Sequence, residues 1–386
     1  MNSRRPKNTQ RIRRILAIGA CAVTLWTAAV TANSESLLGA VTALRTQGPV
    51  QALRWELGDF FTLSDLSPAT VLAIAESPLL LSAREQILRR QESDLSEQSQ
   101  PSDTDTEPVA EEPVEPETPP GVDNGIPART LIPSSPAGYT VVGGVYISNS
   151  TDHVLDTAAL GSGTFDASLT DEEPQILILH THGSEAYTLP PGQSYEPSGN
   201  HRTTDTKYNV VRVGDEMADV FAEAGISVLH DRTLYDYPEY SGAYGRALTA
   251  IDAYMAQYPS IRFILDVHRD AIEDSDGNQY KVVSVVDNVG TAAQVSIVMG
   301  SDGSGLPHDR WMENLKLAVA VQQNIVNAYP TLMRPVVLRN SRYNQHVTTG
   351  SMLVEMGAAG NSLDEALLAA RLFTEQFIQV LEAKNK

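Results

Sequence analysis

The feature that most limits the possible folds is a run of four apolar residues, Ile176 to Leu179, bounded by Pro174 and His180. A continuous apolar run of this length is typical of a strand that is covered on both faces. Further strand patterns alternate with stretches of helical spacing towards the carboxyl terminus. We expect strands at 226–229, 263–267, 282–286, 295–299 and 352–354, and helices at 210–225, at 311–328 and from 362 onward. Residues 139–386 are therefore predicted to form an α/β domain, with a largely parallel sheet flanked by helices.

The amino-terminal segment, residues 1–34, has the order of an export signal. Six basic residues and no acidic one precede Ile15 to Ala32, a stretch of 18 residues without a charge. At about 1.5 Å per residue, such a helix nearly spans the hydrocarbon core of a membrane, which is about 30 Å thick. We expect an uncleaved anchor in the cell membrane, crossing it once, with the rest of the chain on the extracytoplasmic side. A cleaved signal is the alternative, because Val30-Thr31-Ala32 offers small residues to a signal peptidase.

Two further segments separate the predicted anchor from the predicted domain. Residues 35–91 have interrupted helical spacing, which predicts short helices beside the membrane. Residues 92–138 form an acidic, proline-rich linker: between Glu92 and Asp123 there are eleven acidic residues, six prolines and no basic residue. Such a segment has little apolar surface to bury and its charges repel one another, so we expect an extended tether.

The overall charge and the cysteine count exclude several classes of protein. The chain has 48 acidic and 28 basic residues, a formal net charge of −20, which argues against a nucleic-acid-binding protein. Its single cysteine excludes an internal disulfide framework and any cysteine-rich zinc module. Any bound metal would therefore have to be held by histidines and carboxylates.

Four such side chains stand at the carboxyl ends of predicted strands. His182 and Glu185 follow the first strand, His268 ends the strand at 263–267, and Glu355 follows the strand at 352–354. Ligand sites in parallel sheets lie at this edge. Two imidazoles and one carboxylate make an open zinc site with a fourth position for water, and the second carboxylate is then available as a general base. The pattern predicts a hydrolytic Zn²⁺ centre.

Four segments resemble the stage II sporulation protein P family, in the order expected for that family. They are PQILILHTHGSEAY from Pro174, YNVVRVGDEMADVFAEAGISVLHD from Tyr208, ILDVHRDA from Ile264, and SRYNQHVTTGSMLVEMGAAGNSLDEA from Ser341. The resemblance covers about residues 140–383. It implies a membrane-anchored, zinc-dependent peptidoglycan hydrolase: an N-acetylmuramoyl-L-alanine amidase, with endopeptidase activity on cross-linked stem peptides also attributed to the family.

The resemblance also implies roles for individual residues. His182 and His268 match metal ligands, and Glu355 matches the catalytic base. Glu185 fits the His-x-x-Glu element as the third ligand, whereas Asp205 is the alternative suggested by the broader amidase class.

Three polar residues are candidates for substrate binding. Arg269 could orient the neighbouring ligand or bind a stem-peptide carboxylate. Asn344 and His346 precede the strand that carries Glu355 and are expected to line the substrate site. Their position next to that strand is the only signal for them.

The expected reaction is hydrolysis of the bond between N-acetylmuramic acid and L-alanine. One alternative is a zinc carboxypeptidase or endopeptidase acting on stem peptides, and another is a non-catalytic scaffold that binds the cell wall. The resemblance further implies the stage II sporulation proteins D and M as partners during engulfment.

Overall fold

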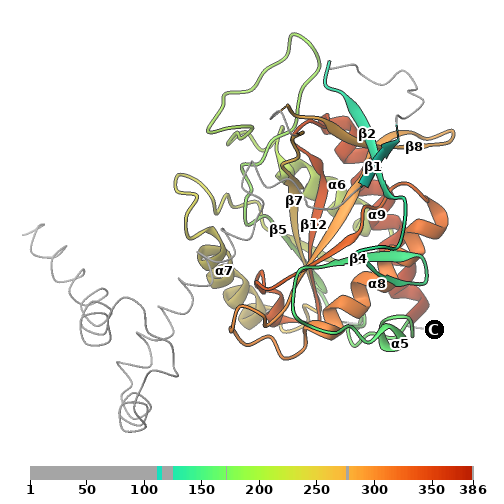
Figure 1. The fold of residues 1–386 in the computed structure, drawn as a ribbon. Coiled ribbons are helices and arrows are strands. Elements are labelled where there is room, and N and C mark those ends of the chain that lie inside the picture. Colours follow the sequence, from blue (N-terminus) through green and yellow to red (C-terminus); the bar gives the residue numbers. More distant parts are fainter. Residues whose placement is uncertain (1–110, 115–124, 171, 275–277, 385–386) are drawn as a thin grey trace, which may run out of the picture. The chain divides into compact units, whose positions relative to one another are not determined.

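The computed structural model describes residues 111–114, 125–170, 172–274 and 278–384 (Figure 1). Its central element is a sheet of eight strands in the order β3, β4, β11, β10, β12, β7, β5, β6. In that order the strands are Thr140–Val142, Val145–Asn149, Val336–Arg339, Val295–Gly300, Gly350–Ala358, Phe263–Asp270, Ile176–Leu179 and Val228–His230. Five of the seven pairings are parallel, the exceptions being β3 with β4 and β10 with β12. The predicted α/β fold with a largely parallel sheet is confirmed.

The antiparallel contact between β10 and β12 divides the sheet into two blocks that run in opposite directions. The strands β12, β7, β5 and β6 are mutually parallel, so their carboxyl ends meet at one edge. The strands β10, β11 and β4 end at the opposite edge. Only the first block can therefore bring loop residues together at the edge where the sequence predicts the metal site.

Helices cover both faces of the sheet. They are α5 (Thr157–Leu160), α6 (Val210–Glu223), α7 (Ala243–Gln257), α8 (Trp311–Ala328) and α9 (Leu363–Lys384), with a short 3₁₀ helix, η2, at Gln345–Val347. The main core lies between one face of the sheet and the helices α6, α8 and α9. Helix α7 packs on the other face, against Leu177, Leu179 and Ile264.

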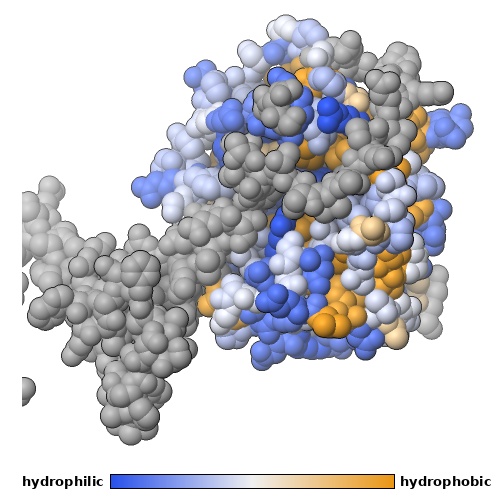
Figure 2. All heavy atoms as spheres, in the orientation of Figure 1, coloured by the Kyte–Doolittle hydropathy of each residue, from blue (hydrophilic) through white to orange (hydrophobic). Residues whose placement is uncertain are grey.

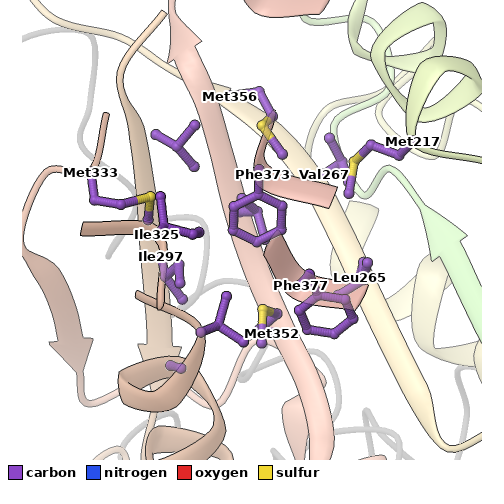
Figure 3. Close-up of a cluster of buried hydrophobic side chains, with 14 of the residues drawn as sticks. Met217, Leu265, Val267, Ile297, Ile325, Met333, Met352, Met356, Phe373 and Phe377 are labelled. Atoms are coloured by element: carbon purple, nitrogen blue, oxygen red, sulfur yellow. The ribbon is translucent and has the colours of Figure 1, made fainter. Parts of the chain in front are cut away.

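The main core determines which way the side chains of β12 point. Met352, Val354 and Met356 are buried in this core, where Figure 3 shows the two methionines near Phe373 and Phe377 of α9. Because successive side chains of a strand point to opposite faces, the intervening Leu353 and Glu355 point to the other face. The hydrophobic pattern of this strand therefore directs Glu355 to the face that α7 only partly covers.

A smaller sheet contains the strands β1, β2, β8 and β9, in that order. They are Glu111–Val114, Ala128–Pro133, Lys281–Val286 and Gly290–Ala293. The strand expected at 282–286 is thus present as β8, but it pairs with β2 and with its own hairpin partner β9, and is not part of the central sheet. A run of apolar residues predicts a strand, but its pairing depends on the following turn, which sends β9 back along β8.

The predicted linker boundary at residue 138 is also wrong. Strand β2 lies within residues 92–138, and its Leu131 is buried against Val282 and Ala358. The apolar pair Leu131-Ile132 supplies surface that the acidic part of the linker lacks, so the folded domain begins before Tyr139.

On the face drawn in Figure 2, hydrophobic surface gathers near β4 and α8, and hydrophilic residues dominate the upper part.

None of the helices in the described part of the chain is long and apolar enough to cross a membrane. The predicted anchor at residues 15–32 and the predicted helices at 35–91 lie outside the described residues. Both therefore stay predictions.

Candidate metal centre

The structure brings the three predicted metal ligands together at the carboxyl end of the parallel block. One ligand atom from each of His182, Glu185 and His268 lies within 4.8 Å of the other two. Glu185 directs Oε1 to Nδ1 of His182 at 3.6 Å and Oε2 to Nδ1 of His268 at 3.5 Å. All three side chains are buried. The arrangement has the two imidazoles and one carboxylate of an open zinc site.

The loop after β5 is held in place so that His182 and Glu185 face the same point. The backbone N–H of Glu185 donates to the carbonyl of His182, which closes a tight turn. Ser184, inside that turn, donates its backbone N–H to Asp236. A Cβ added to Gly183 would lie 2.8 Å from a methyl group of Leu234, so a larger residue would push the turn outward. The spacing of three residues therefore works because the turn is tight and clamped.

The hydrogen-bonding state of the cluster fits a metal site. Both ring nitrogens of His182 and Nδ1 of His268 are buried, yet they have no hydrogen-bond partner among the described residues. Buried polar atoms without partners are costly, and they need an explanation such as an ion. Burial lowers the pKa of His182, so this imidazole is neutral and available as a ligand. Burial opposes the ionisation of Glu185, but its contacts with the two histidines outweigh burial and hold its pKa well below the usual range.

Glu355, the predicted base, lies directly beside the cluster. It is the register partner of His268, so the two side chains leave the sheet on the same face. Its Oε2 is buried and accepts no hydrogen bond from the described residues. Burial, together with the charge of Asp270, raises the pKa of Glu355 to about 8. A carboxyl group in this environment can exchange a proton near neutral pH.

A β-bulge follows Glu355 immediately. Between Glu355 and Ala358, β12 has one residue more than its partner β7, and Gly357 adopts φ +77°. A Cβ on Gly357 would lie 2.7 Å from the Cβ of Ala293, so both conformation and space favour glycine there. The carbonyl of Met356, within the bulge, accepts a hydrogen bond from Tyr187. The bulge ends regular pairing just beyond Glu355, as is common next to active sites.

The carboxylate of Asp266 contacts the ring of His268, an interaction that was not predicted from the sequence. Its Oδ1 lies 2.9 Å from Nε2 of His268, and the same carboxylate accepts hydrogen bonds from the backbone and the hydroxyl of Thr181. Although burial opposes protonation of His268, Asp266 and Glu185 raise its pKa well above the usual range. The alternation Asp-x-His in a strand could have revealed this pair, since residues two apart share a face.

Arg202 and Tyr240 form the outer side of the cluster, and the sequence offered no signal for either. Arg202 contacts Glu185 at 3.4 Å and Asp236 at 2.7 Å, and its guanidinium lies over the ring of Tyr240. Tyr240 in turn stacks on His182, with 4.5 Å between ring centroids. These residues come from loops distant in the sequence, so only the fold brings them together.

The three predicted substrate residues occupy different places. The guanidinium of Arg269 donates to the carbonyls of Ala186, His201 and Asp270, so it ties the first loop to β7. Asn344 donates to the carbonyl of Tyr244 next to the site. His346 lines a separate cavity of about 360 Å³. His346 precedes Gly350, the first residue of β12. At 3.3 Å per residue, Gly350 lies about 16 Å along the strand from Glu355. For all three, substrate binding stays a prediction.

Two other residues near the first loop, Asp205 and His180, lie outside the cluster. Asp205, the alternative third ligand, is exposed, and its Oδ1 accepts a hydrogen bond from the backbone of Lys207. It is not part of the cluster. His180, which directly follows β5, is not part of the cluster either, and its Nε2 lies 2.9 Å from Nε2 of His230. Glu185 is therefore the better placed third ligand.

The raised pKa of Glu355 predicts a pH-dependent stability of the metal-free protein. The folded state keeps this proton up to about pH 8, whereas the ordinary pKa is 4.5. Between these values the folded state binds more protons than the unfolded state, so stability falls as pH rises from 4.5 to 8. We expect Glu355→Gln to remove this fall, an effect on the order of a few kcal/mol. Urea unfolding of both proteins with chelator at pH 5 and pH 8 measures it; equal pH dependence would contradict the assignment.

Comparison with known proteins places this domain in context. The sequence model of the family "Stage II sporulation protein P" matches residues 70–378. Stage II sporulation protein P of Bacillus subtilis (strain 168) is 24% identical over 229 residues, which is 55% of this chain and 52% of the relative. The chain thus spans about half the length of that curated relative.

Solved structures with some similarity include two N-acetylmuramoyl-L-alanine amidases. The N-acetylmuramyl-L-alanine amidase Ami1 of Mycobacterium smegmatis is 12% identical, with a TM-score of 0.35, over 55% of this chain and 100% of that chain. The N-acetylmuramoyl-L-alanine amidase of Clostridium difficile 630 is 14% identical, with a TM-score of 0.34, over 57% and 100%. Scores this low carry no argument about activity.

Proposed function

Because the chain belongs to the stage II sporulation protein P family, we propose that it is a zinc-dependent peptidoglycan hydrolase that acts in sporulation. The bond that we propose it cuts is the amide between N-acetylmuramic acid and L-alanine. One observation carries the proposal: the buried cluster of His182, Glu185 and His268 stands directly beside the carboxyl group of Glu355, whose Oε2 accepts no hydrogen bond from a described residue. This combination is suited to hydrolysis of an amide without a serine or cysteine nucleophile.

In such a reaction the ligand residues, Glu355 and Arg269 would have different roles. His182, Glu185 and His268 would hold a zinc ion, which when bound would polarise the amide carbonyl and activate water. Glu355 accepts the proton of the attacking water and returns it to the leaving nitrogen, which its position and raised pKa favour. Arg269 keeps the loop that bears Glu185 against β7.

The setting of the enzyme is part of the proposal. The basic and apolar order of residues 1–32 supports an anchor in the cell membrane, with the hydrolase domain on the extracytoplasmic side where peptidoglycan lies. Membership of the family supports the stage II sporulation proteins D and M as candidate partners. Co-purification of the full-length chain with each of them would test the partners.

Digestion of purified peptidoglycan by the full-length protein tests the reaction. Mass spectrometry should find intact stem peptides released from the glycan in the presence of zinc, and no release after chelation. Products cut only within the stem would move the assignment to an endopeptidase or carboxypeptidase. Bound zinc without any product would favour the non-catalytic scaffold.

Asp266 offers a test of the metal centre that does not depend on activity. We expect Asp266→Asn to lower zinc affinity about 10- to 100-fold, because the carboxylate next to Nε2 orients His268 and increases its basicity. Competition with a chromophoric chelator measures the affinity. Asp364→Asn, which changes an exposed residue at the start of α9, is the matched control and should leave affinity unchanged.

A further inference from the structure

A strained loop runs along the face of the sheet that carries Glu355. Two consecutive residues, Tyr343 and Asn344, have φ values of +46° and +56°, which residues other than glycine rarely adopt. The loop is nevertheless firmly held. The side-chain amide of Asn344 donates to the carbonyl of Tyr244, and that of Gln345 bonds to both Val298 and Gly300 of β10. Strain that is fixed by so many contacts is characteristic of functional sites.

This loop packs the ring of Tyr343 on the face of β12 that carries Glu355. Tyr343 packs with Leu353, Tyr244 and the partly buried Val298. Leu353 and Glu355 are two residues apart on β12, so they share a face and lie about 7 Å apart along the strand. Tyr244 connects this group with the cluster, since its ring centroid lies 5.8 Å from that of Tyr343 and 5.5 Å from that of His182. Tyr343 is therefore one side chain away from both the base and a ligand.

The hydroxyl of Tyr343 forms no hydrogen bond within the described part of the protein. Only 3% of the residue is exposed, but its hydroxyl is not among the fully buried polar atoms that lack a partner, so the hydroxyl keeps some accessible surface. Buried tyrosines normally find a partner for this group. Burial raises the pKa of Tyr343, so the phenol keeps its proton and is a donor. A protonated donor without a protein partner is available to a ligand.

We propose that Tyr343 contacts the substrate by donating a hydrogen bond from its hydroxyl to a carbonyl or sugar oxygen of the peptidoglycan strand bound beside Glu355. The inference rests on the proposed function, since it takes the ligand to be peptidoglycan. It explains why two strained residues are kept at this point of the loop. It also extends the site beyond Tyr244, whose ring neighbours the rings of both His182 and Tyr343.

Removal of the single oxygen by Tyr343→Phe tests this contact. We expect binding of the full-length Glu355→Gln protein to purified peptidoglycan to weaken roughly three- to tenfold when Tyr343→Phe is added, which corresponds to the loss of one hydrogen bond. With Glu355 intact, kcat/KM should fall by a similar factor. The thermal midpoint should not change, because the ring and its packing remain. Tyr329→Phe, at the end of α8, is the matched control.

The possible results separate this inference from the proposed function. Unchanged binding and unchanged kcat/KM in Tyr343→Phe would overturn it, and so would a loss of thermal stability without a loss of binding. If the protein binds peptidoglycan but does not cleave it, the proposed reaction fails and the binding comparison alone decides about Tyr343. If the protein does not bind peptidoglycan at all, both fail.

Discussion

Glu355→Gln should reduce peptidoglycan cleavage by a factor of about 10² to 10⁴, the usual contribution of a general base. The side chain keeps its size, and the strand keeps its register with β7, so the fold should persist. What is lost is the group that can take a proton from water next to the cluster. Release of stem peptides per enzyme, measured by mass spectrometry at equal zinc occupancy, gives the magnitude.

Two comparisons make this result specific. Because Glu355 is not one of the three clustered ligand residues, the variant should still bind zinc with an affinity close to that of the original protein. In the original protein, activity should rise with pH as Glu355 loses its proton, since only the ionised form is a base. Cleavage by the variant at the original rate would remove Glu355 from the mechanism. Loss of zinc from the variant would instead make it a ligand.

The second large effect concerns the third ligand. Glu185→Ala should lower zinc affinity by more than about 100-fold, beyond the range typical of residues that only support a ligand. The carboxylate of Glu185 faces Nδ1 of both His182 and His268, so it completes the cluster. Asp205→Ala should leave affinity unchanged, because Asp205 is exposed and apart from the cluster. Zinc content after dialysis against a metal buffer measures both.

Thermal unfolding provides an independent measure of the same prediction. Zinc at about 100 times its dissociation constant should stabilise the original protein by about 2.7 kcal/mol, because the ion binds the folded state. Asp205→Ala should respond in the same way, and Glu185→Ala should not respond. The opposite pattern, with zinc binding lost in Asp205→Ala and kept in Glu185→Ala, would establish Asp205 as the ligand.

The central features of the fold could be predicted because they depend on local patterns. The apolar run at Ile176–Leu179 and the alternation of strands with helices identify a covered parallel sheet. Since parallel strands end at a common edge, the same patterns bring His182, His268 and Glu355 to one place. The pairing of β8 in a second sheet was not predictable in this way, because hydrophobic runs do not encode which strand lies beside them.

By itself, the sequence determined the α/β class, the edge of the sheet that carries the site and the side chains at the strand ends, since each depends on residues close together in the chain. Only the tertiary structure decided the rest. It made Glu185 the better placed ligand over Asp205, placed Asp266 next to His268, and packed Tyr343 against Leu353 on the face of β12 that carries Glu355. The physical reason is that ligand geometry, burial and hydrogen bonding depend on loops that meet only when the domain is packed.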